Sequence, residues 1–420
     1  MFLKIVPKSS FAKNILTLLT GTTIAQAIPI AISPILTRLY TPQDFGVLAL
    51  FISIVFIFSS ISTARYEVAI MLPKSKEEAI NVAALSFLIN LLISAVLLII
   101  IAIFYSEIIT LLGNKEIGFW LYFAPLSILF LGIFNILNYL NTRDENYKDI
   151  SKAKVYKSVV LASLQIVVAL FKSGASGLIT GQIFSQLIAN TKLAKNILKD
   201  KSLISSINFK SIKKVAKKYI DFPKYSMPTA LIHSLGNDFL NILISAFFNI
   251  ATLGFYSFAI KMLGIPTSLI GESISQVFFK EAVREKHEKD SSKEIFIATT
   301  KKLILIAIPL FLSIYIFAED AFAFIFGEDW RVAGEYAKIV TPIFFANFIF
   351  VSVSSIFDIY KGLKIELLLQ TIMMIGSILI IYLMRDYSFK EFLKVYTIFS
   401  CIIYLISYIV AFNLAKGSNE

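Results

Sequence analysis

Twelve apolar segments, most of them about 20 to 28 residues long, alternate with charged clusters along the 420-residue chain. A helix needs roughly 20 apolar residues to cross the hydrocarbon core of a bilayer, so this spacing predicts membrane-spanning helices rather than the alternating ten-residue pattern of an outer-membrane barrel. The expected spans are residues 11–39, 45–72, 79–104, 117–140, 155–171, 174–194, 225–248, 253–279, 295–318, 333–357, 363–384 and 389–414.

The composition agrees with an all-α integral membrane protein. Hydrophobic residues make up 57% of the chain and charged residues 16%, whereas a soluble protein carries about 25% charge. The one cysteine, Cys401, lies in an apolar segment, where we expect an inert packing role.

The net charge of +12 is spread over the connections between spans, with its densest part between Lys192 and Lys224. That stretch carries ten lysines and two acids, and its apolar residues recur at helical spacing, which predicts a basic amphipathic helix. Of the 40 Lys and Arg residues, 29 fall on one side of the twelve spans and 8 on the other. The positive-inside rule therefore places both termini in the cytoplasm and makes a nucleic-acid partner unnecessary.

Weak internal similarity suggests two halves. Gly46 near the start of the second span matches Gly254 in the eighth, and a Gly precedes a Trp after the third span (Gly113, Trp120) and again after the ninth (Gly327, Trp330). We expect the two Trp side chains to be anchors in the outer membrane interface. Six spans per half give both halves one orientation, as in transporters built from parallel repeats. The predicted parts are a lobe at residues 1–198, a basic cytoplasmic linker at 199–224 and a lobe at 225–420.

Signatures of soluble chemistry are missing from the sequence. There is no Gly-x-x-x-x-Gly-Lys-Ser/Thr motif, and His233 and His287 are not part of a His-Glu-x-x-His pattern. The predicted outer connections are too short to hold a catalytic domain. We therefore expect no enzyme, no catalytic residue, no metal and no cofactor, and work driven by gradients or by substrate binding.

Charged residues inside the expected spans mark candidate sites, because burying a charge in the bilayer costs several kcal/mol. Arg65 lies near the cytoplasmic end of the second span with Glu67 beside it. Arg65 either extends to the nearby interface or lines a polar cavity together with Glu67.

Lys261 and Asp238 each stand about eleven or twelve residues from the expected turn near Asn249, which is roughly 17 Å down their helices. They form either a structural ion pair or a gating pair in which a proton, a sodium ion or an anion competes for one partner. Asn237 and Asn241 add amide oxygens that suit a coupling cation, although amides also join transmembrane helices. Coupling to H⁺ or Na⁺ is the expectation that follows.

Arg38, at the outer end of the first span, and Lys157, in the fifth, are further cations that either line the same cavity or extend to the interface. Together with Arg65 and Lys261 they bias the charge between the spans toward positive. Such a bias suits an anionic ligand such as phosphate.

Three stretches resemble the polysaccharide-biosynthesis flippases, including the O-antigen flippases, of the multidrug/oligosaccharidyl-lipid/polysaccharide exporter superfamily. They read TRLYTPQDFG at Thr37 to Gly46, ARYEVAI at Ala64 to Ile70 and FGEDW at Phe326 to Trp330. The resemblance implies two six-helix lobes around a V-shaped cavity. It also implies movement of an undecaprenyl-pyrophosphate-linked oligosaccharide across a bacterial inner membrane, with Arg65, Glu67 and Lys261 on matching positions.

Three other functions remain as alternatives. A multidrug antiporter of the same superfamily would carry organic cations in an acidic or aromatic cavity, and a membrane glycan polymerase or glycosyltransferase would need a larger outer loop. A major-facilitator carrier would show a Gly and Arg signature after the second span, where the chain reads PKSKEE. The expected partners are the lipid-linked oligosaccharide, membrane lipids and other glycan-assembly membrane proteins.

Overall fold

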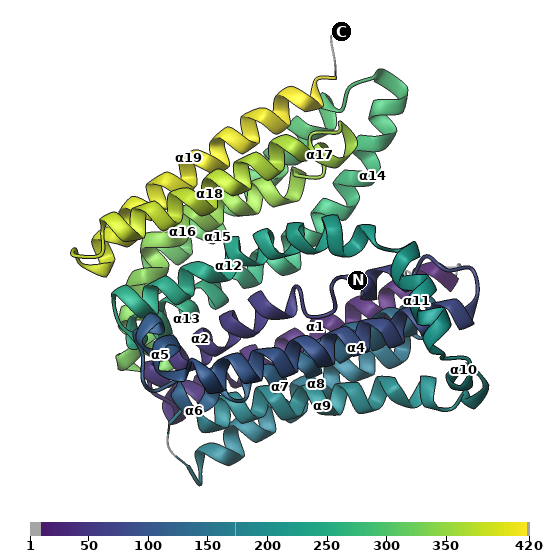
Figure 1. The fold of residues 1–420 in the computed structure, drawn as a ribbon. Helices are drawn as coiled ribbons and strands as arrows, with labels where there is room; N and C mark the ends of the chain where they lie inside the picture. Colours follow the sequence, from purple (N-terminus) through teal and green to yellow (C-terminus); the bar gives the residue numbers. More distant parts are fainter. Residues whose placement is uncertain (1–9, 173, 418–420) are drawn as a thin grey trace. The chain divides into compact units, whose positions relative to one another are not determined.

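The computed structural model describes residues 10–172 and 174–417. Its contacts divide the chain into two units, residues 1–242 and residues 243–420. Within the described residues every regular element is a helix and no strand occurs (Figure 1). The all-helical class expected from the sequence is confirmed, while the predicted lobe and linker boundaries stay predictions.

Six long helices build the first unit. α8 packs along α1 and α9, and α7 packs along α2, α4 and α9. The long helices are α1 (Ser10–Leu39), α2 (Pro42–Ser59), α4 (Lys76–Ile103), α7 (Ala124–Arg143), α8 (Tyr147–Ala169) and α9 (Ser176–Leu198). The shorter ones are α3 (Tyr66–Ala69), α5 (Tyr105–Leu112), α6 (Gly118–Leu121), α10 (Lys201–Ser205), α11 (Phe209–Lys218) and the π-helical turn η1 (Phe222–Ser226). α12 (Met227–Phe247) crosses from this unit into the second.

The sequence motif after α1 is a helix start. Thr41 caps α2 by accepting a hydrogen bond from the backbone N–H of Asp44, and the Asp44 carboxylate accepts one from the N–H of Thr41 at 2.8 Å. Pro42 occupies the first turn of α2, where a missing N–H costs nothing. The Tyr40 hydroxyl donates to the carbonyl of Gln165 at 2.5 Å and ties this corner to α8.

The second expected span is broken. α2 ends at Ser59, and the chain passes through a turn to α3, with Ala64 and Arg65 both at positive φ (49° and 63°). Hydroxyls near the break satisfy the local backbone, because Ser60 donates to the carbonyl of Ile57 at 2.7 Å and Ser62 to that of Ser59 at 3.1 Å. Serine hydroxyls that compete for backbone carbonyls are thus concentrated where α2 ends.

The basic stretch forms an amphipathic helix, as predicted, but its apolar face is covered by protein. Val215 on α11 is buried against the core of α3, α4 and α7, and the Tyr66 hydroxyl donates to the carbonyl of Ala216 at 2.8 Å. Asn81 on α4 donates to the carbonyl of Ser206 at 3.1 Å and accepts from the N–H of Asn208 at 3.1 Å. α10 and α11 are therefore docked on the first unit.

The second unit contains α13 (Ile250–Pro266), the π-helical turn η2 (Thr267–Gly271), α14 (Glu272–Lys289), α15 (Lys293–Phe326), the 3-10 turn η3 (Glu328–Trp330), α16 (Arg331–Val353), α17 (Ile356–Ile359), α18 (Leu363–Leu383) and α19 (Phe389–Ala415). α16 packs along α13, α15 and α19. Asn249 caps α13 and accepts from the N–H of Thr252 at 2.7 Å, so the turn expected there is present.

The two Trp residues are buried in protein. Trp120 is 9% exposed and Trp330 is 1% exposed. The Trp330 ring packs 4.6 Å from that of Phe258 and 5.8 Å from that of Phe255, centroid to centroid. The prediction that these side chains anchor the chain in the membrane interface is wrong, because aromatic packing inside each unit takes up their surface.

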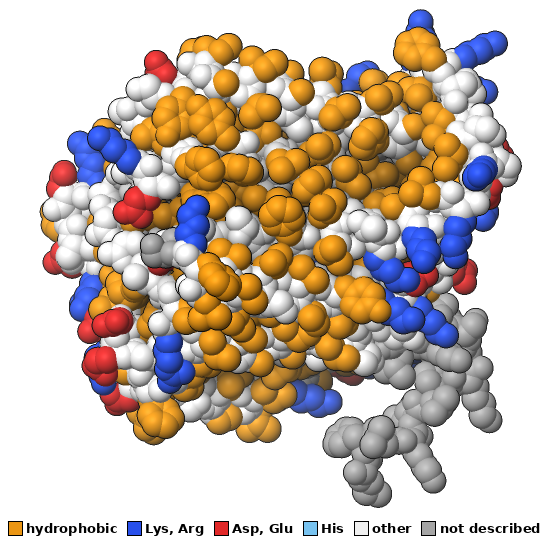
Figure 2. Space-filling model, turned by 90° about the horizontal axis from the view of Figure 1, so that it is seen from below, with side chains coloured by type: hydrophobic (Ala, Val, Ile, Leu, Met, Phe, Trp, Pro, Cys, Tyr) orange, Lys and Arg blue, Asp and Glu red, His pale blue; other side chains and the backbone are white. Residues whose placement is uncertain are grey.

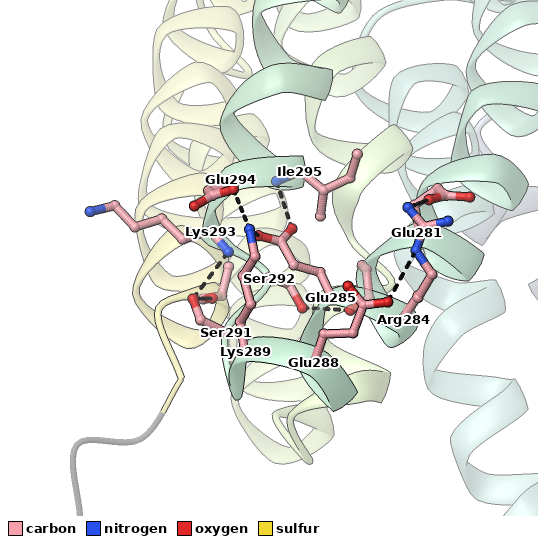
Figure 3. A network of polar contacts seen from close by, with 12 residues as sticks. Glu281, Arg284, Glu285, Glu288, Lys289, Ser291, Ser292, Lys293, Glu294 and Ile295 are labelled. Atoms are coloured by element: carbon pink, nitrogen blue, oxygen red, sulfur yellow. Dashed lines mark hydrogen bonds and ion pairs between the residues drawn. The ribbon is translucent and has the colours of Figure 1, made fainter.

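A polar network holds the connection between α14 and α15 (Figure 3). The mostly buried Glu285 carboxylate accepts from the N–H of Ile295 at 2.8 Å and lies 3.8 Å from the Lys289 ammonium. Ser292 donates to the carbonyl of Ala282 at 2.7 Å. Asp290 ends α14 in a left-handed conformation, which lets the chain reverse.

Each of the twelve apolar segments contains helix in the described residues, although some, the second and fourth among them, are interrupted by turns. By length and apolar content, seven helices of the described chain can cross a membrane, and an eighth if the bent pair Phe222–Gly236 and Asp238–Phe247 is one span. The multi-span membrane class is supported by this result, and the count of twelve spans stays a prediction.

Candidate functional site

A cavity of about 930 Å³ opens in the first unit, beside the break between α2 and α3. Its wall is built from the end of α2, the Arg65–Glu67 segment, one residue of α7, η1 with the preceding Asp221, and the first part of α12. The lining residues are Phe56, Ser59, Ser60, Arg65, Glu67, Asn135, Asp221, Phe222, Tyr225, Ser226, Thr229, Ala230, His233, Ser234 and Asp238.

Arg65 and Glu67 form an ion pair at this wall. Arg65 Nη1 lies 3.2 Å from Glu67 Oε1, and the Glu67 side chain is almost completely buried while 32% of the Arg65 side chain is exposed. Glu67 also accepts a hydrogen bond from the Thr63 hydroxyl. Thr63 and Arg65 thus hold the Glu67 carboxylate in place. The partly exposed guanidinium of Arg65 keeps N–H donors available to a ligand in the cavity.

Arg65 also connects the break between α2 and α3 to η1, which forms another part of the cavity wall. Its Nε lies 3.5 Å from the Ser226 hydroxyl at the end of the π-helical turn η1. π-Helical turns are uncommon and occur often at functional sites. The positive φ of Arg65 turns its side chain out of the helix line and toward this turn.

Asp238 lies on α12 at the far end of the lining. The Ser234 hydroxyl is 3.5 Å from Asp238 Oδ2, and Ser53 on α2 also hydrogen-bonds to this carboxylate. Asn241, one turn further along, donates to the Ser53 hydroxyl at 2.9 Å. The structure therefore brings Asp238 and Asn241 together around Ser53 and joins α12 to α2. Asn241 here acts as a link between helices, which was the alternative to cation binding.

The lining is not basic. Among the described lining residues Arg65 is the one Arg or Lys, against the carboxylates of Glu67, Asp221 and Asp238. Phe56, Phe222 and Tyr225 contribute aromatic rings, and His233 an imidazole. The sequence predicted an excess of cationic side chains in a site that includes Lys261. That excess stays a prediction, because Lys261 is not among the lining residues.

Of the predicted site residues whose side chains the structure describes, Arg38, Asn241 and Lys261 are not part of this lining. Arg38 ends α1 on the surface and donates to the carbonyl of Pro34 at 3.1 Å. Lys261 stands exposed on α13 of the second unit, so its pairing with Asp238 stays a prediction. The Asn237 side chain lies outside the described residues.

Sequence reasoning missed the contribution of η1. Asp221, Tyr225 and Ser226 line the cavity, although Asp221 was assigned to the polar linker and the other two to the start of the expected seventh span. The available signal was Pro223, which follows a short polar segment and favours an irregular helix start.

Lys157 lies in a separate, smaller cavity of about 150 Å³, together with Ser127, Gln182 and Gln186. Its ammonium lies 5.7 Å from the centroid of the Phe134 ring. One interpretation of the sequence had Lys157 extend to the membrane interface. The structure instead places this side chain in an internal cavity between α2, α7, α8 and α9.

The fold is that of a group of membrane transporters. The chain aligns with the lipid II flippase MurJ in an inward closed conformation at a TM-score of 0.72 and 13% identity, over 95% of this chain and 87% of MurJ. It aligns with an inward-facing multidrug resistance MATE family transporter of the MOP superfamily at a TM-score of 0.63 and 15% identity, over 95% of this chain and 93% of the other.

The chain belongs to the polysaccharide biosynthesis protein family, whose model matches residues 35–335. It is 21% identical over 308 residues to the succinoglycan biosynthesis transport protein ExoT of Rhizobium meliloti, and 28% identical over 117 residues to the teichuronic acid biosynthesis protein TuaB of Bacillus subtilis. These matches cover 71% and 28% of this chain, and the chain spans 59% and 24% of the length of those relatives. The family resemblance seen in the sequence is confirmed.

Proposed function

We propose that this protein moves an undecaprenyl-pyrophosphate-linked oligosaccharide from the cytoplasmic to the periplasmic leaflet of a bacterial inner membrane, with both termini in the cytoplasm. One observation carries the proposal most directly: Arg65 is held at the wall of a 930 Å³ cavity with part of its guanidinium exposed. A planar guanidinium binds a phosphate through two parallel hydrogen bonds, and pyrophosphate offers several oxygens of this kind.

The ion pair suggests how the head group is bound and released. When a pyrophosphate enters, Arg65 shares its donors between Glu67 and the ligand, and Thr63 keeps Glu67 in place. The lipid tail stays in the bilayer while the head group occupies the cavity. Alternating access then exposes the cavity on the other side, and Glu67 recovers the full guanidinium once the ligand has left.

Asp238 is the proposed coupling residue. Its carboxylate contacts Ser53 and Ser234, and proton or Na⁺ binding there changes the link between α12 and α2. A membrane potential of 100 mV supplies about 2.3 kcal/mol for each charge moved, which is sufficient to bias the cycle. Other glycan-assembly proteins of the membrane are the proposed partners that supply and remove the lipid-linked substrate.

A second candidate function is export of an organic cation. The acidic and aromatic lining of the cavity, with Asp221, Asp238 and Tyr225, favours this candidate. Carboxylates and aromatic faces both attract cations. The two candidates differ in what Arg65 does, since a cation carrier has no use for a guanidinium that contacts the ligand.

Reconstituted vesicles distinguish the two. The purified chain is incorporated into vesicles that contain a fluorescent undecaprenyl-pyrophosphate oligosaccharide, and its movement between leaflets is followed by quenching from outside. We expect Arg65→Gln to reduce the rate roughly 10- to 100-fold, the loss that follows from one charge-assisted contact, and Arg65→Lys to retain part of it. Lys261→Ala should also reduce it.

The matched control is Lys172→Gln, which removes a cation from the surface outside the cavity. Normal transfer by both Arg65→Gln and Lys261→Ala at equal protein density contradicts the proposal. Efflux of ethidium by the wild type that persists in Arg65→Gln and is lost in Asp238→Asn would establish the second candidate instead.

A further inference from the structure

A second hollow of about 590 Å³ lies on the first unit between α7 and α9, separate from the cavity that Arg65 lines. One wall consists of apolar residues of α7, which are Phe130, Ile133 and Leu137. The other consists of Leu187, Asn190, Thr191, Ala194, Lys195, Leu198 and Lys199, all on or directly after α9. We refer to it as the α7/α9 groove.

The groove has a direction. Asn190 donates to the carbonyl of Phe130 at 2.8 Å, and Asn141 donates to the carbonyl of Leu193 at 3.2 Å, so α7 and α9 run side by side in the same direction. From Leu187 to Lys199 the groove follows twelve residues of α9, which is about 18 Å. Ala194 contributes a small side chain to the lining, and most of the other lining residues on α7 and α9 are apolar, which suits a linear apolar chain.

Charge is concentrated at one end of this groove. Lys195 and Lys199 are exposed there, and neither takes part in an ion pair within the described part of the chain. The nearby carboxylates have other partners, since Asp149 binds Lys192 at 2.9 Å and Asn196 at 2.9 Å. Asp200 accepts from the N–H of Leu203 at 3.0 Å. The two lysines therefore present positive charge at the mouth of an apolar groove.

The position of the two lysines along the chain suits a lipid head group. Lys195 and Lys199 follow the apolar part of α9 on the side where the sequence places 29 of the 40 basic residues. Figure 2 shows a face of the molecule with an apolar middle and charged side chains at opposite edges, as a bilayer requires.

We propose that the α7/α9 groove binds an anionic phospholipid of the cytoplasmic leaflet. One acyl chain lies along Phe130, Ile133 and Leu137, and the phosphate contacts Lys195 and Lys199. This lipid stays bound to the protein and fills the α7/α9 groove of the first unit. It is not the transported substrate, and the site is independent of Arg65 and of the proposed flippase activity.

Native mass spectrometry of the purified full-length chain tests the head-group half of the proposal. The protein is released from nanodiscs that contain equal amounts of phosphatidylglycerol and phosphatidylcholine of the same acyl chains. We expect the wild type to retain phosphatidylglycerol preferentially and the variant K195Q/K199Q to lose about 30-fold of that preference, as two lysines near a membrane surface contribute. The control K213Q/K217Q removes two exposed lysines of α11 and should keep the preference.

The groove itself is tested by filling it. Ala194→Trp places a large side chain in the lining and should reduce retention of both lipids, while Ile188→Trp, at an exposed position of α9 outside the lining, should not. Equal retention of the two lipids by the wild type overturns the proposal, as does an unchanged preference in K195Q/K199Q. A dimer that Ala194→Trp dissociates also overturns it, because a second copy would then cover the groove.

The test does not depend on transport. Loss of lipid retention by K195Q/K199Q, with oligosaccharide transfer still measurable in phosphatidylcholine vesicles, supports this site separately from the proposed function. If both Arg65→Gln and Lys261→Ala leave transfer unchanged, the flippase proposal fails while the lipid result still holds.

Discussion

Arg65 Nη1 lies 3.2 Å from Glu67 Oε1 although Arg65 stands just outside α3 with a φ of 63°. The pair is local in sequence but exists only because the second span breaks. A continuous helix would place residues two positions apart on different faces. The break therefore creates the ion pair and the cavity wall together.

Removing one partner of this pair should destabilise the protein more than removing both. Arg65→Gln leaves the buried Glu67 carboxylate without its cation, and we expect a loss of about 1 to 3 kcal/mol in the free energy of unfolding. The double variant R65Q/E67Q should recover part of that loss. Thermal unfolding in detergent of the four proteins of this cycle gives the coupling, and strictly additive effects would contradict a direct pair.

Ala64 tests the backbone of the break. It adopts a φ of 49° while buried, a conformation that glycine adopts without strain and β-branched residues adopt poorly. We expect Ala64→Gly to keep or raise the melting temperature and Ala64→Val to lower stability by more than about 1 kcal/mol. Ala69→Gly within α3 serves as control and should be destabilising. An unchanged melting temperature in Ala64→Val would show that the break is not held in this form.

Gly334 in the second unit marks a close helix contact. A Cβ at this position would lie 2.6 Å from the carbonyl oxygen of Ala318 and 2.7 Å from the Cα of Glu319, both backbone atoms of α15. Gly334→Ala should therefore cost about 1 to 3 kcal/mol of stability, because α15 and α16 must move apart. Gly236→Ala is the matched control, since no atom lies within 4 Å of its added Cβ. Equal melting temperatures for the two variants would contradict the tight packing.

Asp149 predicts a dependence of stability on pH. Hydrogen bonds from Lys192 and Asn196 lower the pKa of the Asp149 carboxyl below its usual value of about 3.8. A lowered pKa in the folded state means that the stabilisation is present above the unfolded-state pKa and is lost as the pH falls through the lower folded-state value. Because both side chains are partly exposed, we expect the contribution to be below about 1 kcal/mol.

The measurement is the melting temperature from pH 6 to pH 3. Asp149→Asn should unfold earlier than the wild type at pH 6, and the difference should shrink toward pH 3. A constant difference over this range would mean that the charge of Asp149 is not involved.

The helices of this fold were predictable because apolar length dominates the energetics of a membrane chain. Segments such as 79–104 and 363–384 coincide with α4 and α18 for this reason. The break after Ser59 was missed because the expected second span was continued through the polar residues that follow Ser59. The serines are readable in the sequence, but their hydrogen bonds to backbone carbonyls are seen only in the structure.

The candidate site was predicted in part. Arg65, Glu67 and Asp238 line one cavity, as charges inside spans suggest. Neither the lining by η1 nor the burial of Trp330 follows from the sequence, because both depend on which faces meet in three dimensions. Lys157 is a further example. The sequence shows how far Lys157 lies from the ends of its span, but it does not show the internal cavity into which α8 places the side chain.

The docking of α11 on α4 has a consequence for how the chain is made. Asn81 and its partner Ser206 are 125 residues apart, so α4 leaves the ribosome long before the segment that covers it. α5 to α9 must be synthesised and inserted in between. The α4–α11 contact can therefore close only after α11 has been made, and this part of α4 stays uncovered until then.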